Sequence, residues 1–422
     1  MNRTSASFAD VAGNGLLDRR LLLKGLLGTG ILVASTRAMG NDQPDWMQKP
    51  GRRAKLYGMP AAGELERTGR VALPPQLNAS APLRSLHFTP LDKLRGTITP
   101  AGLHFELSHQ GIPNIDPDQH KLVLHGLVNR PLYFSLDSLE RYSMSTHCHF
   151  LECSGNTTTG WQDPAPDHPL AFSHGLLSAS EWVGVPLATL LDEASVLPEA
   201  KWIIAEGADS GSLSRSIPLQ KALQDCMIVL YQNGERLRPE QGYPMRLLNP
   251  GFEGNSNVKW LRSLKVTDTP AMTRFETSRY TDLLADGKAR QFSLKMDVKS
   301  VITHPNNSQQ LQQKGVYEIS GLAWSGSGRI RKVEVTADGG KSWAKALLDE
   351  PVQSRMLTRF RLPWRWVGQP AVLASRAEDE HGNRQPTRDA LVAARGTNSF
   401  YHYNGIHGWG VSASGEVNQA DV

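Results

Sequence analysis

The sequence predicts two folded domains: an α+β mixed domain over residues 96–285, followed by an all-β immunoglobulin-like sandwich over residues 286–415. Two observations predict this division. In the first region, short apolar strands alternate with short helical runs, with dense Gly and Pro between them. From about residue 305 onward, short strands recur at regular spacing, a pattern typical of a sandwich.

The first 40 residues are interpreted as a signal peptide. Arg19 and Arg20 precede the apolar stretch 25–35, which is too short to span a bilayer and is followed by small residues. Paired arginines before an apolar stretch resemble the bacterial twin-arginine export signal, so we expect a periplasmic protein. Most of the formal net charge of +5 lies in residues 1–40, so the remaining chain gives no indication of a nucleic-acid partner. No later segment is apolar for long enough to predict a membrane span.

Residues 41–95 are rich in Pro, Gly and Arg and show little periodicity. We expect them to form an extended N-terminal arm over the surface. In the mixed domain that follows, apolar runs predict strands at 121–126 and 227–231, and helical runs are predicted at 187–194 and 219–224. The loops between them are long, and such loops usually carry binding residues.

The sequence of the C-terminal region predicts strands and turns throughout. Residues 315–324 predict a strand with a Gly kink, and residues 331–336 alternate with period two. The run Ala-Asp-Gly-Gly at 337–340 predicts a hairpin turn, and further strands are expected at 357–362 and 372–377.

Cys153 is the most informative residue of the mixed domain. The chain contains only three cysteines, which excludes a disulfide scaffold. A short apolar stretch ends in this thiol and is followed by Ser-Gly-Asn, which predicts a strand running into a tight turn. In that turn Gly155 lets the chain bend closely over a bound group, and Asn156 tolerates a left-handed backbone. Such a turn presents a thiolate that a soft metal can bind.

Other interpretations of this run remain open. A zinc cluster built from residues 147–153 is disfavoured, because strand alternation places His147 and His149 on one side and Cys148 on the other, and no second ligand pair appears. A nucleophilic Cys153 would take one of the two histidines as its base. A buried, inert thiol is the usual role of a free cysteine. We expect that role for Cys226, and for Cys148 either that role or a place beside the site.

Three further segments carry polar groups on Gly-rich backbone, at residues 103–113, 206–218 and 241–261. Together they supply carboxylate, amide, guanidinium and ammonium groups. Such a set can hold a large polar heterocycle with a phosphate tail, and Arg246 and Lys259 are natural partners for the phosphate.

These segments, in this order, resemble the sulfite oxidase family of molybdopterin enzymes over nearly the whole chain. The resemblance implies one molybdenum–molybdopterin cofactor per chain, an oxygen-atom transfer reaction, and dimerisation through the C-terminal domain. It implies that Cys153 is the thiolate ligand of molybdenum and that Tyr280 is the active-site tyrosine beside the metal. The cofactor contacts that it implies are Phe105, His109, Asp209, Gln241, Arg246, Asn257, Val258 and Lys259.

The chain departs from the sulfite-oxidising members of the family at several positions. Thr157 and Thr158 follow Asn156 where those members have arginines, and Leu107 and Ser108 occupy a loop that carries another arginine. Position 241 is Gln where those members commonly have His. We therefore expect a pocket without cations, which would bind a free divalent oxyanion poorly.

Within the family, the resemblance is closest to the molybdopterin subunits of Sox sulfane dehydrogenases. The runs that carry it are 174–178, 181–187, 280–283, 321–326 and 398–402. It implies a substrate of sulfane sulfur bound to a carrier-protein cysteine in thiosulfate oxidation. It also implies a c-type cytochrome subunit as electron acceptor, in a heterotetramer around a homodimer of this chain. The sequence has no Cys-x-x-Cys-His motif, so we expect no haem in this chain.

Three alternative functions remain. A periplasmic sulfite dehydrogenase (sulfite:cytochrome c oxidoreductase) would share the fold and the export route. A molybdenum reductase of oxidised methionine shares the cysteine turn but usually lacks the C-terminal β-domain. A non-enzymatic immunoglobulin-like binding protein would leave Cys153, Asp209 and residues 257–259 unexplained.

Overall fold

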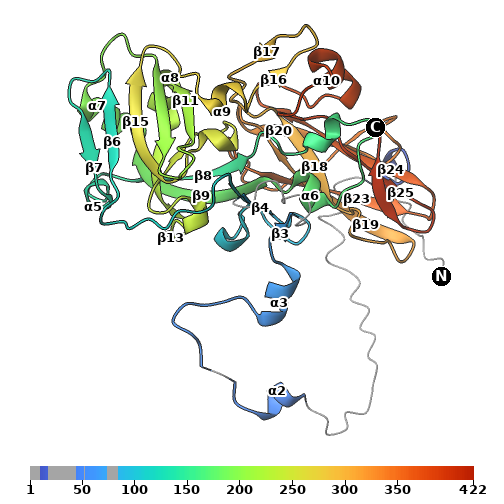
Figure 1. The fold of residues 1–422 in the computed structure, drawn as a ribbon. Coiled ribbons are helices and arrows are strands. Elements are labelled where there is room, and N and C mark those ends of the chain that lie inside the picture. The colour runs from blue at the N-terminus through green and yellow to red at the C-terminus, as the bar shows by residue number, and fades with distance from the viewer. Residues whose placement is uncertain (1–9, 18–43, 52, 74–83) are drawn as a thin grey trace, which may run out of the picture.

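The structure is a computed structural model that describes residues 10–17, 44–51, 53–73 and 84–422. It contains a mixed domain and an all-β sandwich that meet beside strands β8 (Ser145–Glu152) and β9 (Leu177–Pro186) (Figure 1). The predicted fold class is confirmed. The arginine pair and the apolar stretch of the predicted signal peptide lie outside the described residues. Among the residues described, no helix is long and apolar enough to cross a membrane.

The mixed domain is built on two sheets. Across the first sheet the strands are β11 (Ser214–Pro218), β10 (Trp202–Gly207), β15 (Leu261–Thr267), β6 (Leu122–Gly126) and β7 (Leu132–Phe134). Strands β15 and β6 are parallel, and the other neighbours are antiparallel. The second sheet is antiparallel, and its strands in order are β13 (Glu235–Arg236), β12 (Met227–Gln232), β9 and β8, with β14 (Arg246–Leu248) also paired to β12.

Two amphipathic helices fill the core of this domain. Helix α7 (Leu187–Ala194) begins directly after Pro186, and α8 (Leu219–Asp225) begins directly after Pro218. Proline suits this position because its fixed φ starts a helix and its missing N–H would have no helical partner there. In α7 the buried residues are Leu187, Leu190, Leu191 and Ala194, at the i, i+3, i+4, i+7 spacing of one helix face. Both predicted helices are confirmed.

The sandwich consists of two facing sheets. The central strands of the first sheet are, in order, β18 (Lys299–His304), β19 (Gly315–Trp324) and β23 (Thr358–Trp366). The short strand β22 (Leu347–Leu348) pairs with β23. A hairpin of β1 (Asp10–Ala12) and β2 (Leu16–Leu17) extends the sheet beyond β23. In the second, the order is β21 (Ala344–Lys345), β20 (Ile330–Thr336), β24 (Ala371–Asp379), β25 (Gly408–Val411) and β26 (Val417–Ala420). The four predicted strands of this domain are present as β19, β20, β23 and β24. The predicted hairpin is present as the antiparallel pair β20 and β21, but its connection is longer than expected and spans residues 337–343.

A small third sheet brings the N-terminal region into the mixed domain. Its strands are β3 (Val71–Ala72), β4 (Ser85–Phe88) and β5 (Glu106–Ser108). The first two come from the predicted arm, so the end of that segment is part of the folded body. The helices α2 (Asp45–Gln48) and α3 (Ala62–Arg67) lie away from the body (Figure 1).

The remaining elements are short. The helices are α5 (Leu136–Leu139), α6 (Leu170–His174), α9 (Arg274–Thr277) and α10 (Arg388–Arg395), and one further strand pair is β16 (Asp282–Leu283) with β17 (Ala289–Arg290). The 3₁₀ turns are η2 (Ala101–Leu103), η3 (Thr158–Trp161), η4 (Pro239–Gln241) and η5 (Gly254–Ser256).

The two domains share a hydrophobic cluster and buried ion pairs, among them Glu152–Lys299 and Asp282–Arg395. Phe150 of β8 and Leu177 of β9 pack in the same cluster as Trp324 of the sandwich. Beside them the Glu152 carboxylate accepts hydrogen bonds from Lys299 Nζ at 3.1 Å and from Trp324 Nε1 at 2.6 Å. Glu152 is 1% exposed and Lys299 is 2% exposed, so this contact between the domains is excluded from water.

We expect Lys299→Met to lower the free energy of unfolding by about 3–5 kcal/mol, because it leaves the Glu152 charge buried without its cation. The control is Lys345→Met, which removes an exposed lysine of β21 and should change stability by less than about 0.5 kcal/mol. Chemical denaturation of both variants measures the difference. Equal stabilities would show that the ion pair does not hold the domains together.

Candidate functional site

Cys153 lies at the first position after β8, in a tight turn. The turn is closed by the hydrogen bond from Asn156 N to Cys153 O, at 2.9 Å, and Cys153 N donates to Leu176 O at 3.0 Å. The left-handed residue is Thr157, with φ of 65°, and not Asn156 as the sequence suggested. Asn156 serves differently, because its buried amide donates to Glu152 Oε1 at 2.9 Å and accepts from Leu176 N at 3.2 Å.

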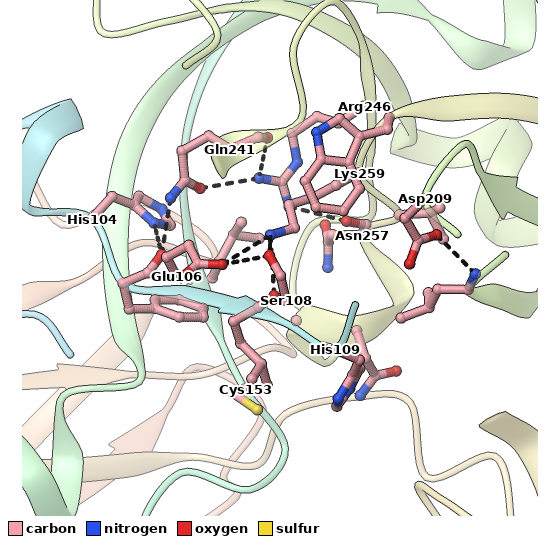
Figure 2. Close-up of a pocket in the computed structure, with 18 of the residues that line it drawn as sticks. His104, Glu106, Ser108, His109, Cys153, Asp209, Gln241, Arg246, Asn257 and Lys259 are labelled. Carbon is pink, nitrogen blue, oxygen red and sulfur yellow. Dashed lines mark hydrogen bonds and ion pairs between the residues drawn. The ribbon is translucent and has the colours of Figure 1, made fainter. Parts of the chain in front are cut away.

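The structure brings all ten predicted site residues to one pocket. They come from the ends of β8, β5 and β10, from η4, from the start of β14, and from the segments after η5 and before β16. They are Phe105, His109, Cys153, Asp209, Gln241, Arg246, Asn257, Val258, Lys259 and Tyr280. Cys153 and His109 lie on one side of the pocket, and Gln241 and Arg246 on the opposite side (Figure 2). The segments are far apart in sequence, so only the fold makes them one site.

Backbone carbonyls hold the polar side of this pocket in place. Arg246 donates from Nη1 to Gln241 O and from Nη2 to Asn257 O, each at 3.0 Å. Gln241 in turn donates from Nε2 to Phe105 O at 3.0 Å. Each of these side chains is therefore oriented by a neighbouring segment of the same pocket.

The two cations of the pocket, Arg246 and Lys259, are matched in number by Glu106 and Asp209, but among the described residues neither cation has a carboxylate oxygen within hydrogen-bonding distance. Lys259 donates to Leu107 O at 3.0 Å and to Glu240 O at 2.9 Å, and its nearest carboxylate oxygen, Glu106 Oε1, is 3.8 Å away. Burial lowers the pKa of Lys259 to about 8, although Glu106 offsets part of that effect. Burial lowers the pKa of Arg246 to about 9. A bound anion such as a phosphate would relieve this cost.

Several buried polar atoms of the pocket also lack a partner among the described residues: His104 Nε2, Arg246 Nε and Asn255 Oδ1. Burial lowers the pKa of His104 to about 3, so its ring is neutral. Its Nδ1 lies 3.0 Å from Phe105 O and donates to it, which leaves Nε2 as an acceptor. The pocket thus offers donors and acceptors as well as cations, which fits a polar heterocycle with a phosphate. His104 was not among the predicted residues, because one histidine beside Phe105 gives no pattern in sequence.

The position of Cys153 fits a metal ligand, because its side chain lines the same pocket as the unpartnered polar groups. The side chain is 6% exposed, and burial raises the pKa of its thiol to about 11. The thiol is therefore protonated at neutral pH, and a soft metal must displace that proton to bind the thiolate. This chemistry and the unpartnered groups agree with a molybdopterin whose metal lies at Cys153.

Tyr280 lies beside Cys153 in a left-handed conformation, with φ of 54°. Its hydroxyl is 3.1 Å from His109 Nε2. Burial raises the pKa of Tyr280 strongly and lowers the pKa of His109. The phenol therefore keeps its proton, and the neutral imidazole accepts it in a hydrogen bond.

A second, outer cavity of about 580 Å³ meets the first at His109, Cys153 and Tyr280. Its aromatic lining is Phe88, Phe172, Phe275, Phe400 and Tyr401, and its cationic lining is Arg84, Arg274 and Arg279. The expectation of a pocket without cations is therefore wrong. The three arginines come from segments far from the cysteine turn, so the motif alone did not reveal them.

The other candidate residues near Cys153 in sequence lie outside its pocket. The rings of His147 and His149 are stacked, with centroids 5.8 Å apart, and both line a separate cavity that includes Cys226. Cys226 is 1% exposed and Cys148 is half-buried outside the Cys153 pocket. Neither histidine is placed to act as a base for Cys153.

Comparison with known proteins agrees with this geometry. A family model for the oxidoreductase molybdopterin binding domain matches residues 109–275, and one for the Mo-co oxidoreductase dimerisation domain matches residues 290–408. The chain belongs to the sulfite oxidase family of molybdopterin oxidoreductases.

Among solved structures, the chain is similar to the sulfane dehydrogenase SoxCD from Paracoccus pantotrophus. The identity is 42% and the TM-score 0.86, covering 90% of this chain and 98% of that one. Among curated proteins, it is 28% identical to an NADH nitrate reductase of Ulva prolifera and 30% identical to one of Cichorium intybus, over 72% and 71% of this chain. It spans only 40% and 37% of the length of those two enzymes.

We expect Lys259→Met to lower the pterin content of the purified protein at least about tenfold, because a charged hydrogen bond is worth roughly 1.5–3 kcal/mol. Lys265→Met is the matched control, since Lys265 is an exposed residue of β15. Pterin released from both proteins is measured by fluorescence. Full pterin content in Lys259→Met would contradict a role in cofactor binding.

Proposed function

We propose that this protein oxidises sulfane sulfur bound to the cysteine of a carrier protein, as a step of thiosulfate oxidation. The outer cavity is the observation that supports this proposal most directly. Its volume of about 580 Å³ is far more than a four-atom anion needs, and its aromatic walls suit an extended peptide arm. The arm would carry its sulfur atoms to Cys153 and Tyr280, at the inner end.

The residues of the chain have distinct tasks in this proposal. Bound molybdopterin supplies the two-electron oxygen-atom transfer, with the metal held by Cys153. Arg246 and Lys259 hold the phosphate, and the amide and imidazole groups of the inner pocket hold the pterin. Tyr280 keeps its proton, and its hydroxyl, which donates to His109 Nε2 in the structure, would turn to donate to the substrate instead.

A periplasmic sulfite dehydrogenase is the second candidate. Arg84, Arg274 and Arg279 line the outer cavity and could attract a free oxyanion. In the first proposal the same arginines attract the anionic end of the carrier-bound sulfur. Substrate assays therefore decide between the two.

The wider setting is also proposed. The dimerisation-domain match supports a dimer, and we propose that this dimer binds a c-type cytochrome subunit in a heterotetramer. The cytochrome would accept the electrons, and the haem would belong to it and not to this chain. Residues 1–40 would direct export to the periplasm through the twin-arginine route.

Cys153→Ser should abolish turnover while the far-ultraviolet circular dichroism and the pterin content stay unchanged. The reason is that a serine hydroxyl does not replace the thiolate as a ligand for a soft metal. Cys148→Ser is the control, because Cys148 lies outside the pocket. Retained molybdenum and activity in Cys153→Ser would end the assignment of the ligand.

The substrate is tested by steady-state reduction of a c-type cytochrome with sulfite or with carrier protein loaded with sulfane sulfur. We expect kcat/KM to be at least about tenfold higher with the carrier. Phe400 is 53% exposed in the wall of the outer cavity, so Phe400→Ala should lower kcat/KM for the carrier about five- to tenfold. Oxidation of free sulfite by the same variant should be unchanged. Higher kcat/KM with sulfite would favour the sulfite dehydrogenase.

A further inference from the structure

Residues 10–17 form a hairpin that lies against the sandwich, although they precede the arginine pair of the predicted leader. Strands β1 and β2 are antiparallel to each other, and Leu16 of β2 pairs with Trp364 of β23. The hairpin therefore covers an edge of the sandwich that would otherwise expose unpaired backbone groups.

Four hydrogen bonds of 2.7–2.9 Å attach the turn of this hairpin to the sandwich. Gly15 O accepts from Arg365 N at 2.8 Å, and Asn14 O accepts from the Trp364 indole at 2.9 Å. The Asn14 amide donates to Ala337 O at 2.8 Å, and Gly13 N donates to Ser342 Oγ at 2.7 Å. The partners come from β23 and from the β20–β21 turn.

The fit is close enough to be specific. Gly15 has φ of +87°, and a Cβ added there would lie 2.2 Å from Arg365 O. A Cβ on Gly13 would lie 2.2 Å from Asp338 Oδ2. Leu16 is fully buried in the same cluster as Trp364, and Leu17 is 3% exposed. Gly15 is thus required by the backbone that it meets, and both leucines are buried.

We propose that the sandwich carries a binding groove for this hairpin, and that the hairpin is a folding-dependent anchor for the leader. The side-chain hydrogen bonds join residues 323 to 350 positions apart, so the groove exists only after the C-terminal domain has been made and folded. Arg19 follows Leu17 by two positions, so the completed sandwich holds the start of the leader. This last point rests on the proposal that residues 1–40 are an export signal.

Hydrogen exchange on the full-length protein tests the anchor. Amides of residues 10–17 should exchange at least about tenfold more slowly than in the denatured chain. Gly15→Val should abolish this protection, because valine is strained at positive φ and its Cβ meets backbone. Gly51→Val is the matched control, since a Cβ added to Gly51 would meet no atom within 4 Å, and this variant should keep the protection.

Two further measurements separate loss of the anchor from loss of the fold. β18 and β19 should stay protected in Gly15→Val, and a peptide of residues 10–17 added to that variant should slow exchange of the Arg365 amide. The same peptide with valine at position 15 should not slow exchange of that amide. Gly15→Val could unfold the sandwich, and Asn14→Gly is the variant for that case. It keeps the turn and removes only the side-chain hydrogen bonds of Asn14. It should still speed the hydrogen exchange of the amides of residues 10–17. Unprotected residues 10–17 in the wild type, or equal protection in both valine variants, would overturn the proposal.

Discussion

The buried carboxylate of Glu152 determines how the two domains and the cysteine turn are arranged. It accepts hydrogen bonds from Asn156 in the turn and from Lys299 and Trp324 in the sandwich. Lys299 also donates to Thr157 Oγ1 at 2.8 Å, so one ammonium group holds both ends of the turn. Because these groups are buried, removing one partner leaves another without compensation. The position of Cys153 therefore depends on the sandwich, even though the sandwich contributes no group to the inner pocket.

The same dependence extends across the sandwich to the hairpin at its edge. A single apolar cluster contains Leu16 of the hairpin, Trp324 of the sandwich and Phe150 of the cysteine strand. Packing at one end of this cluster is thus continuous with packing at the other. The segment after α10 adds Phe400 and Tyr401 to the outer cavity, so the C-terminal region also shapes the cavity next to Cys153.

The inner pocket is electrostatically incomplete without a ligand. Burial lowers the pKa of Lys259 and Arg246 and raises that of Cys153, so burial disfavours the charged form of each group. An anionic cofactor whose metal takes the thiolate would relieve all three costs together. Cofactor binding and stability are therefore coupled in this fold.

The sequence by itself determined much of the local structure and ten of the residues that line the inner pocket. The spacing of apolar residues and the positions of Gly and Pro are properties of neighbouring residues. The helix α7, the strand β19 and the turn after β8 could therefore be predicted from them. The ordered motifs likewise identified Cys153 and its pocket partners. Only the tertiary structure placed Arg84, Arg274 and Arg279 at the outer cavity and Leu16 in the sandwich core. These placements arise from contacts between segments distant in the chain, and such contacts leave no periodic or local pattern in the sequence.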